Sequence, residues 1–415
     1  MSVDFRLYHS RIFFLISYKM YDNNVIDNNK YNWYVAVVSF ILLCSSQIYI
    51  TWHLSIWNYL YLICILSCIF LSILLSKIEK ANYLHFFLFE ILFVWYSTIH
   101  NASIAGIIFN MSIPLILLIS KELRIRILEL IILKILPVFL AISVITYLLV
   151  SLNVIALPQF FIPPLNSLKN YAYISHIFFI VPTNYWDIGR FHAFYDEPGV
   201  VGSIAGLILC LYGKKMSKAI MMIYLLSGLL SMSFFFIIIT LLGFFTGMIS
   251  TKIKDILKII LIVLPLILLI LNLYDNDYLQ TRVFDRFTLD ETGNVRGNTR
   301  NNEEFEYYFY NTFIHNTTDF LYGSKSNLYL TDGGSSIHNA IFRNGFILVL
   351  LTILTYVSFF CRKIKRKKEA ILFCVIFFCM IYQRPELYSL FYFLLFTTIS
   401  ESNKFTYINI SRCNI

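Results

Sequence analysis

The sequence predicts an all-α protein that is embedded in a membrane and crosses it many times. Among its 415 residues, 58% are hydrophobic and only 14% are charged, whereas soluble domains carry about 25% charged residues. The hydrophobic residues lie in blocks of about 15–25, long enough for a helix to cross the roughly 30 Å hydrocarbon core of a bilayer. The blocks are continuously apolar, while the strands of a membrane barrel alternate. A soluble enzyme, a disordered chain and a β-barrel are therefore excluded.

The apolar blocks predict twelve helical spans, because only helices and closed barrels satisfy their backbone hydrogen bonds in lipid. Two of the spans are short, and each opens a hairpin whose depth in the membrane the sequence leaves open. The whole chain, residues 1–415, is expected to be a single transmembrane domain. The expected spans are 33–51, 55–75, 83–100, 103–120, 128–151, 197–213, 218–230, 234–250, 255–273, 339–360, 370–382 and 387–400.

The basic residues predict the orientation of these spans. They occupy alternate linkers, and the linkers between them carry almost none. By the positive-inside rule, the basic linkers and both termini are expected in the cytoplasm. Most of the net charge of +9 is then a topology signal beside anionic lipid, and no nucleic-acid partner is expected. The basic linkers contain Lys77 and Lys80; Lys121, Arg124 and Arg126; Lys214, Lys215 and Lys218; Lys252, Lys254 and Lys258; and the run from Arg362 to Lys368.

Two long segments are expected on the outer side, as periplasmic loops at about residues 152–196 and 274–337. The first contains four prolines and an apolar stretch at 174–181 that is suited to the membrane interface. The second is the most polar part of the chain. The eight cysteines show no metal-ligand spacing, so neither a metal nor a cofactor is expected.

The first charged cluster lies at the outer end of the span that begins at residue 197. Arg190, His192 and Glu197 precede Pro198 and Gly199 at the expected helix start. The free N–H groups of a helix N-terminus suit a phosphate. The alternative interpretation is an interfacial cap with a surface Arg–Glu pair.

The second cluster lies where the larger outer loop returns to the membrane. His338, Asn339 and Arg343 follow two serines, and His338 is about one helical turn before Arg343, so both side chains are placed to face one cavity. The alternative is a helix cap with an arginine that extends to the interface.

Further charged residues occur at a polar turn and in the larger loop. Arg384 lies in a Gln-Arg-Pro-Glu turn between two apolar helices, where an arginine needs a partner or water; a simple Arg384–Glu386 turn is the plainer interpretation. Arg282 and Arg286 are four residues apart and could present two guanidinium forks together.

The outer clusters resemble those of a known family. Arg190, Phe194, Glu197, Pro198 and Gly202 are similar to the Arg…Phe-x-x-Glu-Pro…Gly pattern of the bacterial O-antigen polymerase family (Wzy-type), within the superfamily of O-antigen ligases and polymerases. The His-Asn pair at 338–339 with Gly345, and the turn at 383–386, also resemble motifs of that superfamily. The Ser-Met-Ser turn at 231–233 lacks the arginine that often follows such serines there, and His192 stands where many members have a small residue.

The resemblance implies a membrane glycosyltransferase with a GT-C-like architecture and an active site that faces the periplasm. Such an enzyme transfers a glycan from undecaprenyl pyrophosphate to the terminal sugar of another lipid-linked repeat unit, with inversion and without a metal. Its implied partners are these lipid-linked donor and acceptor oligosaccharides, membrane lipids and a chain-length regulator protein.

The resemblance also implies roles for individual residues. Arg190, Arg286 and Arg384 are expected to bind pyrophosphate, with support from His192, Arg282, Asn339 and Arg343. Glu197 and His338 are the candidate bases, and Glu197 is favoured because a helix N-terminus keeps it ionised.

Two other functions share much of this pattern. An O-antigen ligase has the same donor but transfers the glycan to lipid A–core, and the Glu-Pro motif favours a polymerase over it. A flippase or other transporter places charged groups near the membrane midplane, whereas the charged clusters of this chain lie at the outer boundary.

Overall fold

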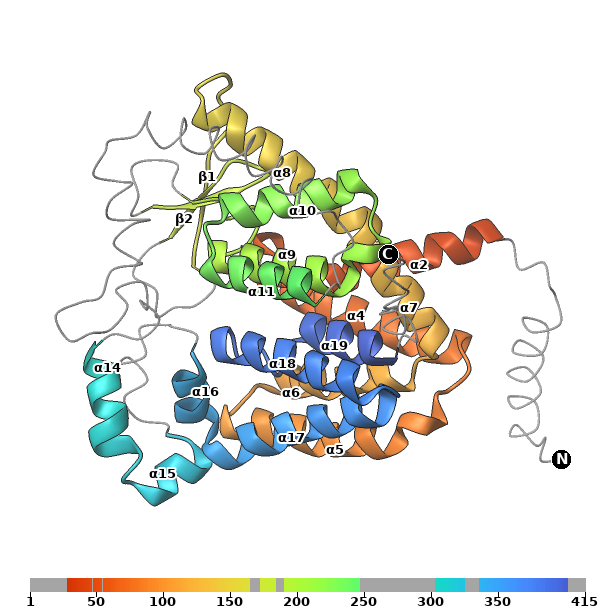
Figure 1. Ribbon diagram of the computed structural model, residues 1–415, viewed down its shortest axis with the longest axis vertical. Helices are drawn as coiled ribbons and strands as arrows, with labels where there is room; N and C mark the ends of the chain where they lie inside the picture. The colour runs from red at the N-terminus through yellow and green to blue at the C-terminus, as the bar shows by residue number, and fades with distance from the viewer. Residues whose placement is uncertain are drawn as a thin grey trace, which may run out of the picture.

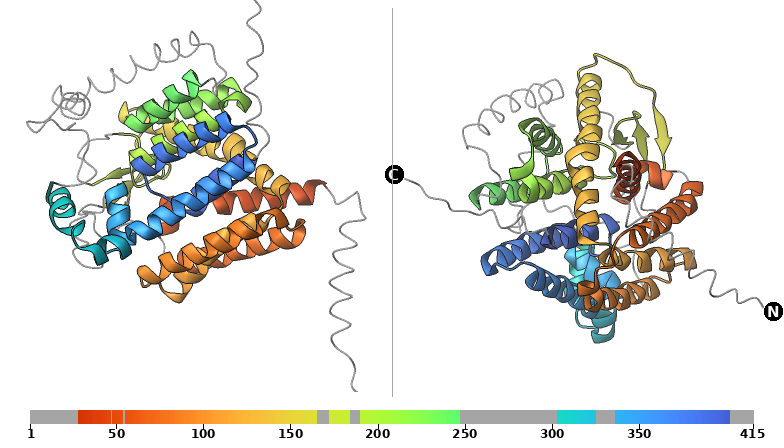
Figure 2. Two further views of the ribbon diagram at one scale, coloured as in Figure 1. Left: turned by 60° about the horizontal axis from the view of Figure 1, so that its bottom comes forward. Right: turned by 90° about the vertical axis from the view of Figure 1, so that its right-hand side faces the viewer.

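The computed structural model describes residues 28–46, 48–53, 55–164, 172–183, 190–246, 303–324 and 336–401. Most of this part of the chain is helical. The helices of the first half are α2 (Asn28–Cys44), α3 (Tyr49–His53), α4 (Ser55–Leu75), α5 (Tyr83–Ile99), α6 (Ile104–Ser112), α7 (Lys121–Leu130) and α8 (Leu136–Ser151). Those of the second half are α9 (Pro198–Tyr212), α10 (Lys218–Leu230), α11 (Phe234–Phe245), α14 (Glu303–Tyr308), α15 (Thr317–Tyr322), α16 (Ile337–Asn344), α17 (Phe346–Lys363), α18 (Lys367–Gln383) and α19 (Leu390–Glu401). Helices α5, α17 and α18 run side by side along one direction, while α7 and α8 cross the bundle obliquely and the short helices α14–α16 lie at other angles (Figures 1 and 2).

Two helices within the described residues are both long enough and apolar enough to cross a membrane: Lys121–Ser151 and Phe346–Lys363. The first of them joins α7 and α8 through a π-helical turn, Ile131–Ile135. Pro137 follows this turn and has no N–H to donate to the carbonyl four residues earlier. A widened turn just before a proline is a common way to accommodate that missing bond.

The predicted helices 55–75 and 218–230 agree with α4 and α10, but three predicted spans are interrupted. The span 33–51 divides after Cys44, and the span 103–120 changes at Pro114 to a 3-10 turn. The span 339–360 breaks at Gly345, which has a φ of +79°. A side chain at Gly345 would overlap the backbone of Leu321, so this close approach requires glycine. The span 255–273 lies outside the described residues.

The prediction of an all-α fold is wrong for the loop 152–196, which contains a small antiparallel sheet. Its strands are β1 (Phe160–Ile162), β2 (Tyr173–Ser175) and β3 (Ile180–Pro182), in the order β1-β2-β3. Ile174 pairs with Phe161 on one side and Val181 on the other. The apolar stretch at 174–181, expected in the membrane interface, therefore forms β2 and β3. Ile162, Tyr173 and Ile180 form a small buried cluster against two aromatic rings, whereas Ile177 and Phe178 in the turn between β2 and β3 are exposed.

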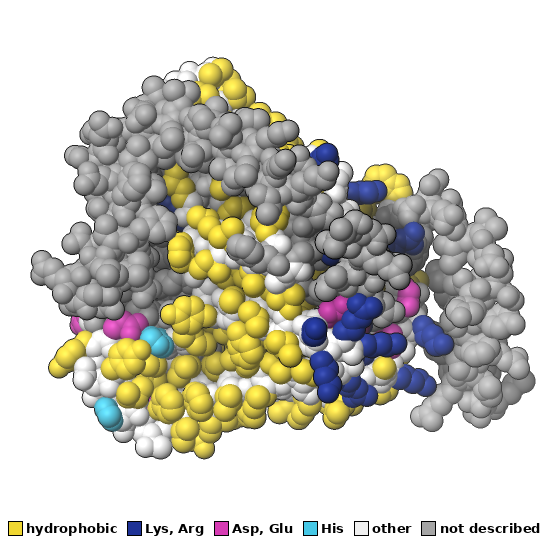
Figure 3. Space-filling model, viewed as in Figure 1, with side chains coloured by type: hydrophobic (Ala, Val, Ile, Leu, Met, Phe, Trp, Pro, Cys, Tyr) yellow, Lys and Arg dark blue, Asp and Glu magenta, His cyan; other side chains and the backbone are white. Residues whose placement is uncertain are grey.

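The bundle has two chemically different ends. Figure 3 shows most of the visible Lys and Arg side chains gathered at one end, which we call the basic end, with a broad apolar surface beside it. The start of α9, the sheet, helices α14–α16 and the turn between α18 and α19 lie at the other end, which we call the opposite end (Figure 1). Nearly every residue of α9 and α19 is buried, so these two helices form the centre of the bundle.

Candidate functional site

The two charged clusters around Glu197 and Arg384 meet at the opposite end of the bundle. Glu197 is the N-cap residue of α9, and Arg384 lies in the turn after α18. One terminal nitrogen of Arg384 donates to the Glu197 carboxylate in an ion pair, although the residues are 187 positions apart. Arg384 is only 5% exposed. The structure therefore joins two motifs that the sequence showed separately, and the favoured base is bound to a guanidinium.

The Arg384 guanidinium fits against the first turn of α9 because Gly199 has no side chain. A Cβ at Gly199 would lie 3.1 Å from a terminal nitrogen of Arg384. Burial disfavours the charged guanidinium, but Glu197 and Asp196 outweigh burial and hold the pKa of Arg384 above its ordinary value. The Nε of Arg384 is buried, and no acceptor among the described residues bonds to it.

Arg190 connects the start of α9 to the turn between α10 and α11. Its Nε donates to the carbonyl of Ser231 at 3.0 Å, and a terminal nitrogen donates to that of Met232 at 3.1 Å. A side chain at Gly202 of α9 would overlap Ser233 in the same turn. The Ser-Met-Ser turn has no arginine of its own, and Arg190 donates to two of its carbonyl groups. Two of its donors are thus used within the protein, and they cannot reach a ligand at the same time.

His192 lies in the wall between the sheet and α9. The residue is buried, and its ring centroid is 6.4 Å from that of Tyr173 on β2. The Tyr173 hydroxyl donates to the carbonyl of Asp196 at 2.8 Å. These contacts hold the segment before Glu197 against the sheet, so His192 contributes to the shape of the site.

His338 belongs to a second cluster on α14, the following π-turn and α16. Its Nδ1 is 3.0 Å from a carboxylate oxygen of Glu306, and its Nε2 is 3.3 Å from the hydroxyl of Tyr310. The side chains of His338 and Glu306 are 28% and 32% exposed, so solvent reaches both. This is a histidine with an orienting carboxylate, an arrangement typical of general bases.

Asn339 and Arg343 lie on the same short helix as His338. Asn339 is buried, and its backbone N–H donates to the Ser336 Oγ, which caps the helix, at 3.1 Å. Burial lowers the pKa of the Arg343 guanidinium, and the hydroxyl of Tyr96 on α5 partly offsets this effect. Arg343 is partly buried and lies close enough to Tyr96 to interact with it electrostatically.

The two clusters border one turn, the segment between α18 and α19. Helix α16 packs against α18. Partial burial and the nearby side chains of Glu306 and Tyr382 raise the pKa of Tyr310, and Tyr382 lies at the end of α18. Glu386 and Arg343 both interact electrostatically with Tyr96. Thus Tyr382 adjoins one cluster and Arg384 belongs to the other.

Several predicted contacts lie elsewhere or outside the described residues. Arg282 and Arg286 lie outside them. Glu90 of α5 and Lys134 of the π-helical turn form no ion pair with each other among the residues the structure places. Within the described ranges, no group of three His, Cys, Asp or Glu side chains could hold a metal ion.

The sequence reasoning missed Glu306 and Tyr310 as partners of His338. They precede it by 32 and 28 residues, and no local motif links them. The available signal was the Glu-, Tyr- and Phe-rich segment before the second cluster, whose helical spacing places Glu306 and Tyr310 on one face.

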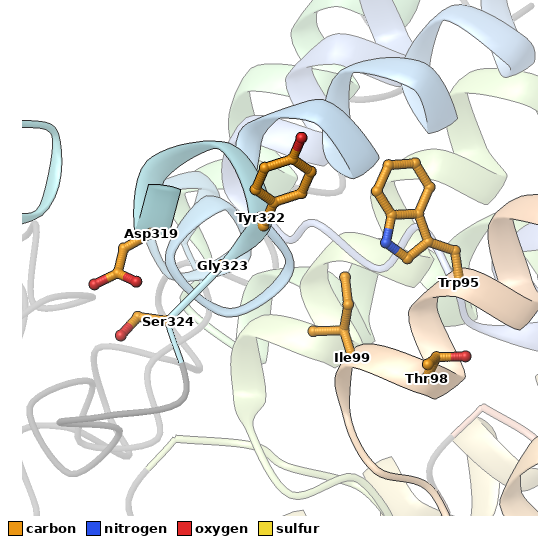
Figure 4. A pocket seen from close by; sticks show the side chains of 7 residues that line it. All are labelled: Trp95, Thr98, Ile99, Asp319, Tyr322, Gly323 and Ser324. Atoms are coloured by element: carbon orange, nitrogen blue, oxygen red, sulfur yellow. The ribbon is translucent and has the colours of Figure 1, made fainter. Parts of the chain in front are cut away.

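A cavity of about 570 Å3 lies apart from both clusters, between the end of α5 and α15. Trp95 and Ile99 approach it from α5, and Tyr322 lies across from them on α15 (Figure 4). None of the residues predicted for the site lines it. The other lining residues are Thr98, Asp319, Gly323 and Ser324.

Comparison with known proteins gave no match: no family model, no curated protein and no solved structure is significantly similar to this chain.

Proposed function

We propose that this chain is an O-antigen polymerase of the bacterial inner membrane. In the proposed reaction, the acceptor is the terminal sugar of one lipid-linked repeat unit. The donor is a glycan on undecaprenyl pyrophosphate, and inversion at its anomeric carbon releases undecaprenyl pyrophosphate. The site faces the periplasm in a bundle of about twelve spans, and a chain-length regulator would act on the same complex.

The distribution of exposed apolar residues supports the membrane part of the proposal. Ile371, Val375 and Phe378 form an exposed stripe along α18, and Leu84 and Ile91 expose a similar stripe on α5. Water would penalise such surfaces, whereas lipid tails would not. Helices α5 and α18 run between the basic end and the opposite end (Figure 1), as the positive-inside pattern requires of membrane spans.

The functional part of the proposal rests on one observation. The three clusters whose residues resemble the family motifs lie around the turn between α18 and α19. They come from segments near residues 197, 338 and 384, and all lie at the opposite end. A transporter would need such groups along a path through the membrane. A concentration of arginines and a histidine at one face favours chemistry on a substrate that projects from that face.

The geometry favours His338 over Glu197 as the base. The Glu197 carboxylate is bound to Arg384, and a proton accepted there would weaken this partly buried ion pair. The imidazole of His338 has a carboxylate on one nitrogen and a hydroxyl on the other. We therefore assign the proton transfer to His338, and to Glu197 the task of holding Arg384.

Arg384 is the proposed main ligand of the pyrophosphate, because its buried Nε lacks an acceptor among the described residues. Arg190 fixes the turn beside it, and Arg282 and Arg286 are proposed to add positive charge from the larger loop. Oriented cations stabilise the charge that develops on the leaving group. An O-antigen ligase would use the same donor site, so the acceptor decides between these two functions.

The test of the function is a purified assay with an undecaprenyl-pyrophosphate repeat unit as the only substrate. We expect products of two or more repeat units, because the same molecule serves as donor and acceptor. A matched reaction supplies lipid A–core as the acceptor. Transfer to lipid A–core alone would identify a ligase, and no transfer to either acceptor would contradict both enzyme assignments.

The orientation is tested by reporter fusions to the chain in cells. Fusions after Gly213 and after Cys361 are expected to report the cytoplasm, because both sites adjoin exposed lysines or arginines. A fusion after Asn298 is expected to report the periplasm. A periplasmic signal at Cys361 would show that the proposed topology is inverted, with the candidate site on the cytoplasmic side.

A further inference from the structure

Glu306 and His338 form a contact that joins two helices of the larger outer loop. Glu306 lies on α14, His338 lies on the first turn of α16, and the Nδ1 of His338 is 3.0 Å from the carboxylate. An ionised carboxylate can only accept a hydrogen bond. The neutral imidazole in this contact therefore carries its proton on Nδ1, which leaves the lone pair on Nε2.

Aromatic packing fixes the plane of this imidazole. The ring stacks on Phe309, with centroids 4.6 Å apart and an angle of 21° between the planes. Phe309 belongs to a buried cluster with Phe305, Phe313 and Phe342. Phe342 lies one turn after His338 on α16, so the cluster holds α14 and α16 together. The direction of the Nε2 lone pair is therefore fixed by packing as well as by Glu306.

The Nε2 lone pair points to a position already occupied by a hydroxyl. The hydroxyl of Tyr310 lies 3.3 Å from Nε2, and its ring is half exposed. A half-exposed tyrosine can move aside at modest cost because little of its ring is packed. The contact shows that a hydroxyl group fits at the base, which is the geometry that an acceptor sugar requires.

We infer that Glu306 is the positioning residue of His338: it fixes the Nδ1–H tautomer and stabilises the imidazolium, while the Tyr310 hydroxyl marks the position of the acceptor hydroxyl. This inference rests on the proposed function for the identity of the acceptor. The acceptor hydroxyl gives its proton to Nε2, and its oxygen forms a bond to the anomeric carbon of the donor. The bond from that carbon to the pyrophosphate oxygen breaks, and its electron pair leaves with the pyrophosphate. The imidazolium then releases its proton to water.

The kinetic test is a double-mutant cycle on the full-length protein in nanodiscs. Glu306→Gln is expected to lower kcat about 10²-fold, within the range for the loss of general base catalysis, with little change in KM. Glu306→Asp should retain most of the activity, because it keeps the acceptor charge. The double variant Glu306→Gln/His338→Gln should be no slower than His338→Gln alone, since groups that act as one unit are not additive. Independent, additive losses would overturn the inference.

The matched control is Glu304→Gln, which removes an exposed carboxylate two residues away on α14. This variant should form polymer at the wild-type rate. An equal loss in Glu304→Gln and Glu306→Gln would show that α14 needs negative charge in general, and would also contradict a specific role.

A second measurement does not depend on activity. The ¹⁵N shifts of His338, assigned by comparison with His338→Gln, should report the Nδ1–H tautomer of the neutral ring. In Glu306→Ala the tautomer should change to Nε2–H. An Nε2–H ring in the wild type would overturn the inference even if polymer forms. If the wild type makes no polymer but shows the Nδ1–H tautomer, the positioning role stands and the proposed function fails.

Discussion

Replacement of Glu401 by glutamine is expected to lower the free energy of unfolding by about 3–5 kcal/mol, because it leaves a buried arginine without its counter-ion. Glu401 ends α19 and pairs with Arg124 of α7 and, at 2.7 Å, with Lys363 of α17. Arg124 is 0% exposed, and its Nε also donates to the carbonyl of Ile119 at 3.0 Å. One carboxylate therefore neutralises two cations and joins three helices at the basic end.

The control for Glu401→Gln is the same substitution in a solvated pair. Glu129 lies 3.5 Å from Lys215, and both side chains are 27% exposed. Such pairs contribute about 0.2–1 kcal/mol, so Glu129→Gln should be nearly neutral. Denaturant titration in mixed micelles, followed by tryptophan fluorescence, measures both changes. Equal midpoints for the two variants would mean that Arg124 gains another partner when Glu401 is neutral.

The Arg124 site also shows where sequence reasoning reaches its limit. Arg124 was counted among the basic residues that face the cytoplasmic lipid surface, and the structure buries it completely. Its partner Glu401 is 277 residues away. Periodicity and charge patterns identify a segment and its side of the bundle, but a pairing over that distance depends on how the helices pack.

The helices themselves could be predicted well wherever local signals define both ends. The helix α10 begins after the Ser217 cap, whose side chain accepts from Ile220, and it ends at the serine turn. The break at Gly345 has a local signal, because Arg343 and Asn344 precede a glycine, but the predicted span of 339–360 continued through it. The close approach of residues 321–323 sets this break. The sheet at 160–182 was missed because its strands have three residues each, too few for a period-two pattern.

The sequence named Glu197, His338 and Arg384 as separate candidates, and the structure adds the contacts that each of them makes. All three belong to segments at the opposite end. The sequence favoured Glu197 as the base because only its own helix could be considered. Its ion pair with Arg384 is a tertiary contact, and this contact changes the chemistry that Glu197 can perform.

The substitution Arg384→Lys is expected to lower the rate of polymer formation about 10²–10³-fold, the usual cost of losing an oriented donor to a developing charge. Lysine keeps the charge and can pair with Glu197, but it has no planar fork and no Nε–H to offer a phosphate oxygen. The buried Nε without an acceptor among the described residues is the group expected to be lost. Turnover of the lipid-linked repeat unit, normalised to folded protein, measures the effect. Arg126→Lys, an exposed arginine at the basic end, is the control and should be unchanged.

A double variant separates this role from a purely structural one. Arg384→Met combined with Glu197→Leu replaces the ion pair by apolar side chains of similar volume, a change that buried pairs often tolerate without loss of stability. If the pair serves only to hold α9 against the α18–α19 turn, the double variant should fold and still polymerise. We expect it to fold, with a midpoint of unfolding close to that of the wild type, and to make no polymer, because neither side chain can then bind or orient the pyrophosphate. Polymer at the wild-type rate from the double variant, or from Arg384→Lys, would remove Arg384 from the donor site and leave the arginines of the larger loop as its cations.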